Sequence, residues 1–522
     1  MSLLPSSLGL SGFSGYRPGQ EDLIWQLAAS PNRFSGLNAP PGTGKSLISM
    51  SVARVLGGRC LYLVVTKNLG RQLLASFESS GLYNINGHLN YPCATSFTTE
   101  DELELECQWG DQCDYRAAVI ESLRHDAVTT NYAHHVSIGK SEDSMRLGEF
   151  DTLVLDEAHN ILPKLSEYLS ITFSERAVSR YVGVSLPDRS ADLSDCLSWA
   201  QEVIPVCRDR YKSLTASKAD PRDIRRVKRI GIDLARFIKD ADRVDWLLKP
   251  QNPQSQYRSL TFLPLDISSY TERYLFRGIK RVLLVSGTLF EDDLKPLGIT
   301  TGYDYTEVPS PFPAAHRAIY FFPSTPAIRV NDQMSKSERT VWQRHVDKIC
   351  EHELSLGNRG IVHTRSYKRA VDMISQSRLS SEQVITHESG SRETSQAIEE
   401  FKLSTEPVAL FSPSLEEGVD FPYDSCRFQI IPKIPFLYHR DVVTAARISR
   451  DKSYADRETC RTMIQEMGRI VRAPDDWGRT YITDSHWEWF RKKKYFYRWL
   501  RLAYKTARQM SDVKPIMQKE NT

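Results

Sequence analysis

One short segment, APPGTGKS at Ala39–Ser46, constrains the fold of this chain more than any other stretch. It matches the phosphate-binding loop, with Ala in place of the usual first Gly. Gly42 and Gly44 let backbone amides face phosphate oxygens. Lys45 reaches the β- and γ-phosphates, and the Ser46 hydroxyl can ligate magnesium. Because Gly-Lys-Ser leads into LISMSVARVL, a good helix pattern, a chance glycine-rich turn is disfavoured.

Short β-branched runs alternate with helical patterns in both halves of the chain. This alternation predicts parallel α/β architecture. The 522 residues exceed the roughly 250–300 at which one hydrophobic core stops growing, so at least two α/β domains are expected. The predicted strand–helix pairs are CLYLVVT–KNLGRQLLASF, TLVLD–EAHN, RVLLVSGT–LFEDDLKPLG and RGIVHT–RSYKRAVDMI, with further strands at PVALFS and RTYITDS.

The strand pattern stops between Ser166 and Arg243, where helical segments predict an insertion. A polar stretch, KPQNPQSQ at Lys249–Gln256, marks a linker at which the chain returns from it.

Composition limits the class of protein. The 68 basic and 65 acidic residues give a net charge of +3, so any polyanion site must be local. No apolar run approaches the roughly 20 residues needed to span a bilayer. The start, MSLLPSSLGLSGF, lacks the features of a secretory signal, and nine cysteines are few. We expect a cytoplasmic protein with reduced thiols and no membrane segment.

Two acidic residues follow an apolar run in TLVLDEAHN. This places Asp156 and Glu157 where a parallel strand meets its loop, the edge at which such sheets bind ligands. Asp156 suits magnesium, and Glu157 suits activation of an attacking water. A DEAH tetrapeptide alone also fits a helix face, but its position downstream of a phosphate-binding loop favours the functional interpretation.

Two arginines near the C-terminus lie in QEMGRIVRAP, Gln465–Pro474. If the segment is helical, Arg469 and Arg472 are one turn apart and can face one target. The pair suits a developing phosphate charge. A solvated helix face is the alternative, and the phosphate loop and DEAH sequence together favour the first interpretation.

These motifs are part of an ordered set that resembles superfamily 2 helicases of the XPD/DinG group over nearly the whole chain. Several motifs in the correct order are highly specific, whereas SGT or GVD alone would be weak. The segments that carry the resemblance are YRPGQ, APPGTGKS, VVTKNLGRQL, TNYAHHV, DEAH, SGTLF, VPSPFP, IVHTRSYKRA, SLEEGVDFPY and QEMGRIVR.

The resemblance implies an α/β fold with two RecA-like motor domains. The first would comprise residues 1–165, with a cysteine-containing insertion at about 84–130, and residues 246–305. A helical, arch-like insertion would occupy 166–245, and the second motor domain 306–522. It further implies an ATP- and Mg²⁺-dependent helicase that translocates 5′ to 3′ on single-stranded or forked DNA and unwinds duplex, acting as a monomer.

Site residues follow from the matched motifs. For catalysis these are Lys45, Asp156, Glu157, Arg469 and Arg472, with Ser46 and Asp156 on magnesium. For ATP binding they are Arg17, Gln20, Pro41, Gly42, Thr43, Gly44, Lys45, Ser46, Asp420 and Gln465. For coupling they are His159, Ser286, Thr288 and Gly418, and for DNA contact Lys67, Arg71 and Arg365.

Two basic segments have open interpretations. RDIRRVKR, Arg222–Arg229, is either a DNA-facing stripe of the arch or a solvated helix face. WEWFRKKKYFYRWLRLAYKTARQM interleaves aromatic and basic residues, and packing of its aromatics on the second domain is favoured over base stacking.

Three cysteines, Cys93, Cys107 and Cys113, lie in an acidic segment and fit no zinc pattern. The XPD/DinG group carries a four-cysteine iron–sulfur domain at this place, between the VVTKNLGRQL segment (motif Ia) and the DEAH segment (motif II). Only three thiols are present here, so a cluster would need a further ligand. Unligated thiols on a retained scaffold are the alternative, and we favour the cluster. The candidate further ligands are His88, Asp111 and Asp114.

Three other functions fit part of the pattern. A translocase that displaces proteins or remodels RNA would keep every motif without separating DNA strands. A binding module with an inactive ATPase would have lost Lys45, Glu157 or Arg469, and all three are present. A metabolic phosphate-loop kinase would have no use for the SGTLF, SLEEGVDFPY and QEMGRIVR segments.

Overall fold

The computed structural model describes residues 3–92, 113–140, 147–250, 258–413, 415 and 419–513. The chain divides into two compact units. The first comprises Met1–Asn38, Lys45–Thr306 and His439–Asp451, and the second comprises Ala39–Gly44, Glu307–Tyr438 and Lys452–Thr522.

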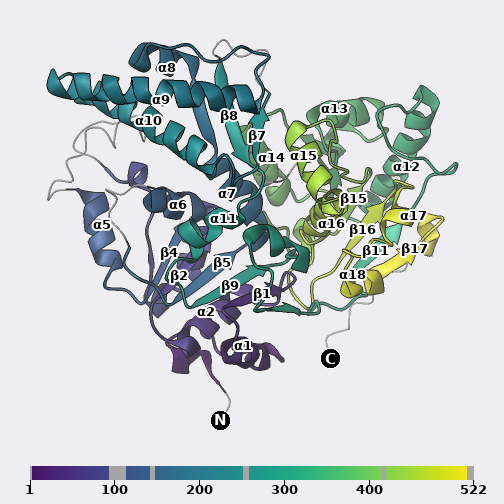
Figure 1. Cartoon of the computed structure of the whole chain (residues 1–522). Coiled ribbons are helices and arrows are strands. Elements are labelled where there is room, and N and C mark those ends of the chain that lie inside the picture. The colour runs from purple at the N-terminus through teal and green to yellow at the C-terminus, as the bar shows by residue number, and fades with distance from the viewer. Residues whose placement is uncertain are drawn as a thin grey trace. The chain divides into compact units, whose positions relative to one another are not determined.

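A seven-stranded sheet forms the centre of the first unit, in the order β10-β1-β9-β5-β2-β4-β3 (Figure 1). All neighbouring strands in the part of this order that runs β1-β9-β5-β2-β4-β3 pair in parallel. The central strands read as continuous apolar runs because both faces of a parallel sheet are buried. The strands are β1 (Phe34–Asn38), β2 (Cys60–Val64), β3 (Leu82–Asn84), β4 (Ala127–Asn131), β5 (Thr152–Asp156), β9 (Arg281–Ser286) and β10 (Tyr303–Glu307).

Helices connect these parallel strands. Thr66 caps α3 by accepting a hydrogen bond from the Leu69 amide, at 3.2 Å. The helices of this part are α1 (Gln20–Ala29), α2 (Lys45–Leu56), α3 (Lys67–Ser76), α5 (Asp114–Ser122), α6 (Tyr132–Lys140), α7 (Ile161–Leu169) and α11 (Ser268–Thr271), which continues as a π-helical turn at Glu272–Phe276.

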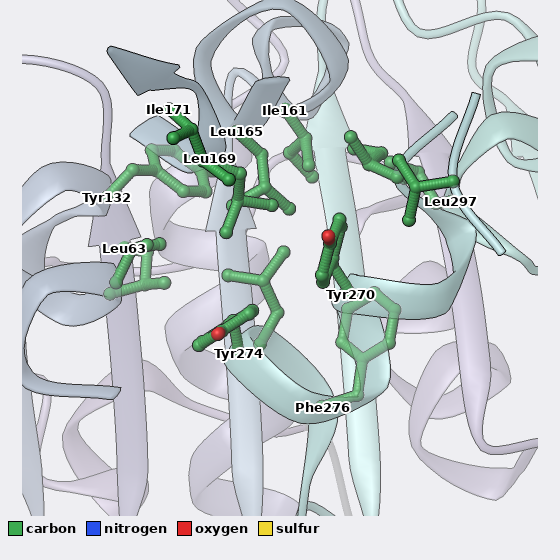
Figure 2. Close-up of a cluster of buried hydrophobic side chains, with 14 of the residues drawn as sticks. Leu63, Tyr132, Ile161, Leu165, Leu169, Ile171, Tyr270, Tyr274, Phe276 and Leu297 are labelled. Atoms are coloured by element: carbon green, nitrogen blue, oxygen red, sulfur yellow. The ribbon is translucent and has the colours of Figure 1, made fainter. Parts of the chain in front are cut away.

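Figure 2 shows the apolar core that packs these helices on the sheet. Leu63 comes from β2, Leu165 from α7 and Tyr270 from α11, and each is at most 4% exposed. Burial of an aliphatic or aromatic side chain of this size contributes about 1.5–3 kcal/mol. The core therefore fixes α7 and α11 against the strands whose carboxyl ends carry the predicted site.

The predicted insertion contains a helical pair and part of a small sheet. Helices α9 (Leu193–Ala216) and α10 (Pro221–Asp240) pack side by side (Figure 1) after the shorter α8 (Glu175–Val182). Asp192 and Asp220 cap the two long helices. The accompanying antiparallel strands, in the order β6-β8-β7, are β6 (Ile171–Ser174), β7 (Trp246–Lys249) and β8 (Ser259–Pro264).

Helix α15 (Val442–Arg450) also belongs to the first unit, where it packs against β7. The Arg450 guanidinium lies 2.6 Å from the Asp245 carboxylate.

A second seven-stranded parallel sheet forms the centre of the second unit, in the order β13-β14-β12-β15-β16-β11-β17. Its strands are β11 (Arg317–Phe321), β12 (Gly360–His363), β13 (Val384–Thr386), β14 (Ala409–Ser412), β15 (Phe428–Ile431), β16 (Gly478–Ile482) and β17 (Tyr504–Thr506). Its helices are α12 (Lys336–Ser355), α13 (Tyr367–Gln376), α14 (Ser391–Leu403), α16 (Tyr454–Met467), α17 (Trp487–Phe490) and α18 (Arg498–Ala503).

The aromatic C-terminal segment packs on this second unit. Trp487, Phe490 and Trp499 are at most 8% exposed, which confirms the packing interpretation for them. Trp489 differs from them, because its side chain is 44% exposed.

The helix predicted after RVLLVSGT is not formed. LFEDDLKPLG forms two 3₁₀ turns, Glu291–Asp293 and Lys295–Leu297, instead of a helix, because Pro296 and the left-handed Gly298 interrupt it. The Lys249–Gln256 linker lies mostly outside the described residues. Within the described part of the chain, no helix is long and apolar enough to cross a membrane.

Candidate functional site

The phosphate-binding loop runs from the end of β1 to the start of α2. Gly42 and Gly44 have φ angles of 82° and 79°, a conformation that favours glycine. The Thr43 amide and hydroxyl both donate to the Pro40 carbonyl, at 3.3 and 2.5 Å. Lys45 is the first residue of α2, so the loop ends at a helix N-terminus, where backbone amides favour anions.

The DEAH sequence begins at the carboxyl end of β5. Asp156 is the last residue of the strand, and Glu157 has a left-handed φ of 46°. The Asp156 carboxylate accepts a hydrogen bond from the Glu157 amide at 3.0 Å. The Tyr132 hydroxyl donates to the Asp156 carbonyl at 2.9 Å, and its ring lies in the core of Figure 2. Tyr132 lies within the TNYAHHV segment, but no local pattern predicts this contact.

Three predicted residues meet beside this turn. The Ser286 hydroxyl, at the end of β9, donates to a Glu157 carboxylate oxygen at 2.9 Å. His159 Nδ1 lies 2.8 Å from the Ser286 hydroxyl and 3.3 Å from the same Glu157 oxygen. The Thr288 amide donates to the Ser286 hydroxyl at 3.0 Å. The DEAH turn and the SGTLF segment therefore form one hydrogen-bonded group.

The two neighbouring carboxyl groups have opposite electrostatic environments. Burial raises the pKa of Asp156, and the adjacent negative charge of Glu157 raises it further. Burial alone would also raise the pKa of Glu157, but Lys45, His159 and Ser286 together hold it well below its usual value. Glu157 is therefore the carboxyl group that stays ionised, and Asp156 is the one whose negative charge needs a cation. A magnesium ion beside Asp156 would supply the positive charge, and the Ser46 hydroxyl and the Asp156 carboxylate are the ligands that would hold it.

The arginines of QEMGRIVRAP are not on a helix, so the predicted helical spacing was wrong. Helix α16 ends at Met467, and Ile470 instead forms a parallel bridge with Phe421. The Arg469 guanidinium donates to the backbone carbonyls of Val419 and Leu415, at 3.2 and 3.0 Å.

Arg472 forms an ion pair with Asp420, another predicted ATP-binding residue. Gln465 is half-buried in the last turn of α16. In the second unit, two predicted residues thus contact each other directly. Gly418 lies outside the described residues.

The predicted ATP-binding residues Arg17 and Gln20 lie just before and at the start of α1. Gln20 is 7% exposed, and its side-chain oxygen accepts a hydrogen bond from the Arg17 amide at 2.7 Å. The Arg17 side chain is exposed. Pro41 belongs to the phosphate-binding loop.

The predicted DNA contacts have different surroundings. Lys67 and Arg71 are both exposed on α3, one helical turn apart. Arg365 has a left-handed φ of 72°, is 16% exposed and forms an ion pair with Glu466. Glu466 was not singled out from the sequence, although it lies between the predicted Gln465 and Arg469. Within Arg222–Arg229, at the start of α10, Arg229 pairs with Asp233 at 3.3 Å.

The cysteine segment is described only at its ends. Cys113 is half-buried immediately before α5, whose first residue is Asp114. The His88 ring packs edge-on against Tyr115, with 5.8 Å between centroids. Cys93, Cys107 and Asp111 lie outside the described residues. Within the residues that are described, no three His, Cys, Asp or Glu side chains come together as a metal site.

Two sequence families match the chain. The family described as "Helicase C-terminal domain" matches residues 351–503, and the family described as "Type III restriction enzyme, res subunit" matches residues 15–181. No curated protein sequence matches it. The chain is a helicase, and its fold is that of XPD helicases. This confirms the resemblance that the ordered motifs carry.

Solved structures of XPD helicases share the fold of this helicase. One described as an XPD helicase is 17% identical over 95% of this chain and 100% of its own, with a TM-score of 0.59. Xpd4 of S. tokodaii is 16% identical over 94% of this chain and 100% of its own, with a TM-score of 0.59. An XPD structure without ligand is 17% identical over 91% of this chain and 97% of its own, with a TM-score of 0.53.

The two parallel sheets are those of two RecA-like domains, as predicted. The helicase is an ATP-dependent nucleotide hydrolase, and its family binds nucleic acid and uses ATP with Mg²⁺.

Proposed function

We propose that this helicase translocates on single-stranded DNA, 5′ to 3′ and as a monomer, and uses ATP hydrolysis to unwind forked duplexes. The observation that carries the proposal is the hydrogen-bonded group of Glu157, His159 and Ser286. It joins the carboxylate assigned to water activation to the end of a neighbouring strand, β9. The XPD-type fold supports the choice of DNA and of direction.

Each site residue has a role in hydrolysis. Lys45 binds the β- and γ-phosphates, and Ser46 and Asp156 would hold an Mg²⁺ ion that neutralises phosphate charge. The ionised Glu157 accepts a hydrogen bond from the attacking water and orients it towards the γ-phosphorus. Arg469 and Arg472 stabilise the charge that develops on the transferred phosphoryl group.

The Ser286 hydroxyl couples hydrolysis to movement on DNA. Because it donates to Glu157 and contacts His159, a change in the charge near Glu157 alters the hydrogen bonds at the end of β9. Thr288 shares this contact through its amide. Gly418 remains a predicted coupling residue of the second unit.

Replacement of Lys45 tests the hydrolytic part of the proposal. We expect Lys45→Ala to lower DNA-stimulated ATP hydrolysis by at least about a hundredfold, because charge stabilisation at the phosphates is lost. Steady-state phosphate release measures the rate of hydrolysis. Lys348→Ala is the matched control, because Lys348 is exposed on α12. Undiminished DNA-stimulated hydrolysis in Lys45→Ala would contradict the assignment.

A translocase that displaces proteins or remodels RNA is the alternative function. Two assays separate it from the proposal. DNA and RNA oligonucleotides of matched length are compared as stimulators of hydrolysis, and then forks with a 5′ or a 3′ single-stranded tail are compared as unwinding substrates. We expect DNA stimulation and unwinding of the 5′-tailed fork. Hydrolysis stimulated without strand separation would favour the alternative.

We also propose that Cys93, Cys107 and Cys113 hold an iron–sulfur cluster, with a further ligand from another side chain. The location of the segment between motifs Ia and II supports it. Cys113 and His88 both lie beside Tyr115, which makes His88 a candidate ligand. Protein purified without oxygen is expected to be coloured and to contain iron and acid-labile sulfide, both lost in Cys113→Ser. Colourless wild-type protein without iron would leave these cysteines as unligated thiols.

A further inference from the structure

The buried carboxylate of Asp476, at the end of the loop that follows Arg472, accepts four hydrogen bonds. Asp476 is 1% exposed. One carboxylate oxygen accepts from the amides of Arg472 and Tyr423, at 2.9 and 3.1 Å. The other accepts from the Arg427 guanidinium and the Trp477 amide, both at 2.8 Å. A buried carboxylate that accepts this many hydrogen bonds is rigidly fixed.

The first of these oxygens joins two segments at strained backbone positions. Tyr423 has a φ of 51°, and Val471, next to Arg472, has a φ of 67°. A left-handed conformation is a genuine outlier for a β-branched residue such as Val471 and is energetically unfavourable. Such residues persist only where their surroundings impose the conformation. The hydrogen bonds from the Tyr423 and Arg472 amides to Asp476 help to impose this conformation on both segments.

The same two segments also contact each other directly. The Phe421 amide donates to the Arg469 carbonyl at 3.2 Å, within the bridge of Phe421 and Ile470. Arg472 is held at two points, because its amide is bonded to Asp476 and its guanidinium to Asp420. The position of its guanidinium therefore depends on a residue that does not contact it.

We propose that Asp476 is a positioning residue for Arg472 in ATP hydrolysis. The proposal rests on the role of Arg472 in the proposed function. The neighbouring Asp475 provides a contrast, because its side chain is exposed and accepts from the Tyr423 hydroxyl, at 3.1 Å, and not from a backbone amide there. Asp476 thus holds the backbone amides of both segments, whereas Asp475 contacts only the hydroxyl at the end of the Tyr423 side chain.

Asp476→Asn tests the proposal, with Asp475→Asn as the matched control. The amide group that replaces one carboxylate oxygen cannot accept, so two of the four donors lose their partner. We expect kcat for ATP to fall by about tenfold to a hundredfold, the size of effect that a shift of a catalytic group by about 1 Å produces. KM for ATP is expected to change little. Asp475→Asn is expected to leave both constants unchanged.

A cycle with Arg472→Ala distinguishes a positioning role from a general structural one. If Asp476 acts through Arg472, Asp476→Asn slows hydrolysis no further in Arg472→Ala protein. Losses that multiply in the double variant would overturn the proposal, and so would wild-type kcat in Asp476→Asn. Unchanged hydrolysis in Arg472→Ala alone would instead refute the proposed role of Arg472. If circular dichroism finds Asp476→Asn unfolded, Asp476→Glu enters the same cycle, and failure of both variants to fold makes Asp476 a stability residue and overturns the proposal.

Discussion

His363, the last residue of β12, is a buried imidazole between polar partners. It is 2% exposed, and its Nε2 lies 3.0 Å from the Gln429 side-chain oxygen. Burial lowers the pKa of His363, and the positive charges of Arg365 and Arg469 lower it further, against the opposing effect of Glu466. The folded protein therefore holds His363 neutral at a pH where the unfolded chain would protonate it.

This difference makes part of the stability of the second unit depend on pH. The unfolded imidazole has a pKa of about 6.5, so the contribution of His363 is complete above that pH. It falls by up to about 1.4 kcal/mol per pH unit as the pH drops from about 6.5 towards the folded pKa. Hydrogen exchange of the β12 amides at about pH 7.5 and 5.5 measures this loss of stability. His363→Gln is expected to lose less protection than the wild type over this interval, and equal losses would contradict the assignment.

Local motifs predicted the residues whose geometry is set by a few neighbours in sequence. Lys45 and Asp156 lie where the phosphate loop and the strand pattern placed them. Arg469 and Arg472 were expected on a helix, but the pairing of Ile470 with Phe421 ends the helical conformation. That pairing joins residues far apart in the chain, so no local pattern could predict it. The same holds for Glu466, whose partner Arg365 lies 101 positions away.

At the scale of elements, an aromatic cluster packs helix α10 of the helical pair on the small antiparallel sheet. The Phe237 ring of α10 stacks on Phe262 of β8, with 4.2 Å between centroids, and meets Trp246 of β7 edge-on at 5.9 Å. Phe237 is 1% exposed. The small antiparallel sheet is therefore the surface on which helix α10 packs.

Phe237→Ala is expected to destabilise this pair by about 3–5 kcal/mol, through lost burial and the cavity that remains. Limited proteolysis should then cleave α9 and α10 well before the wild type is cut there. Ile232→Ala is the matched control on the same helix, because Ile232 is 53% exposed. Equal cleavage rates in Phe237→Ala and wild-type protein would refute the role of this cluster.

The strand–helix alternation predicted most elements because each buried strand has a continuous apolar run. Strand β6 was missed: helices alone were expected between Ser166 and Arg243. Its four residues bury only Ile171 and Phe173, and its partner β8 lies beyond the helical pair. A strand this short is defined by its pairing, which the local sequence does not contain.

At the scale of the whole molecule, nucleic-acid binding must come from local charge. The net charge is only +3, so nonspecific attraction of the entire chain to a polyanion is weak. Lys67 and Arg71 offer two cations on one exposed helix surface of α3, capped by Thr66. The Lys67 ammonium is already oriented by the Asn90 side-chain oxygen, at 2.6 Å. In the proposed function this surface contacts the DNA backbone.

Two phosphate contacts have a measurable signature. Each contact to a single strand contributes about 0.7 to the slope of the logarithm of affinity against the logarithm of salt concentration. We therefore expect the double variant Lys67→Ala/Arg71→Ala to lower this slope by about 1.4, measured by fluorescence anisotropy with an oligothymidylate. The control is Arg344→Ala/Lys348→Ala, which removes an equally spaced and exposed pair from α12. Equal slopes for the two double variants would show that α3 does not contact phosphates, because the loss of charge is the same in both.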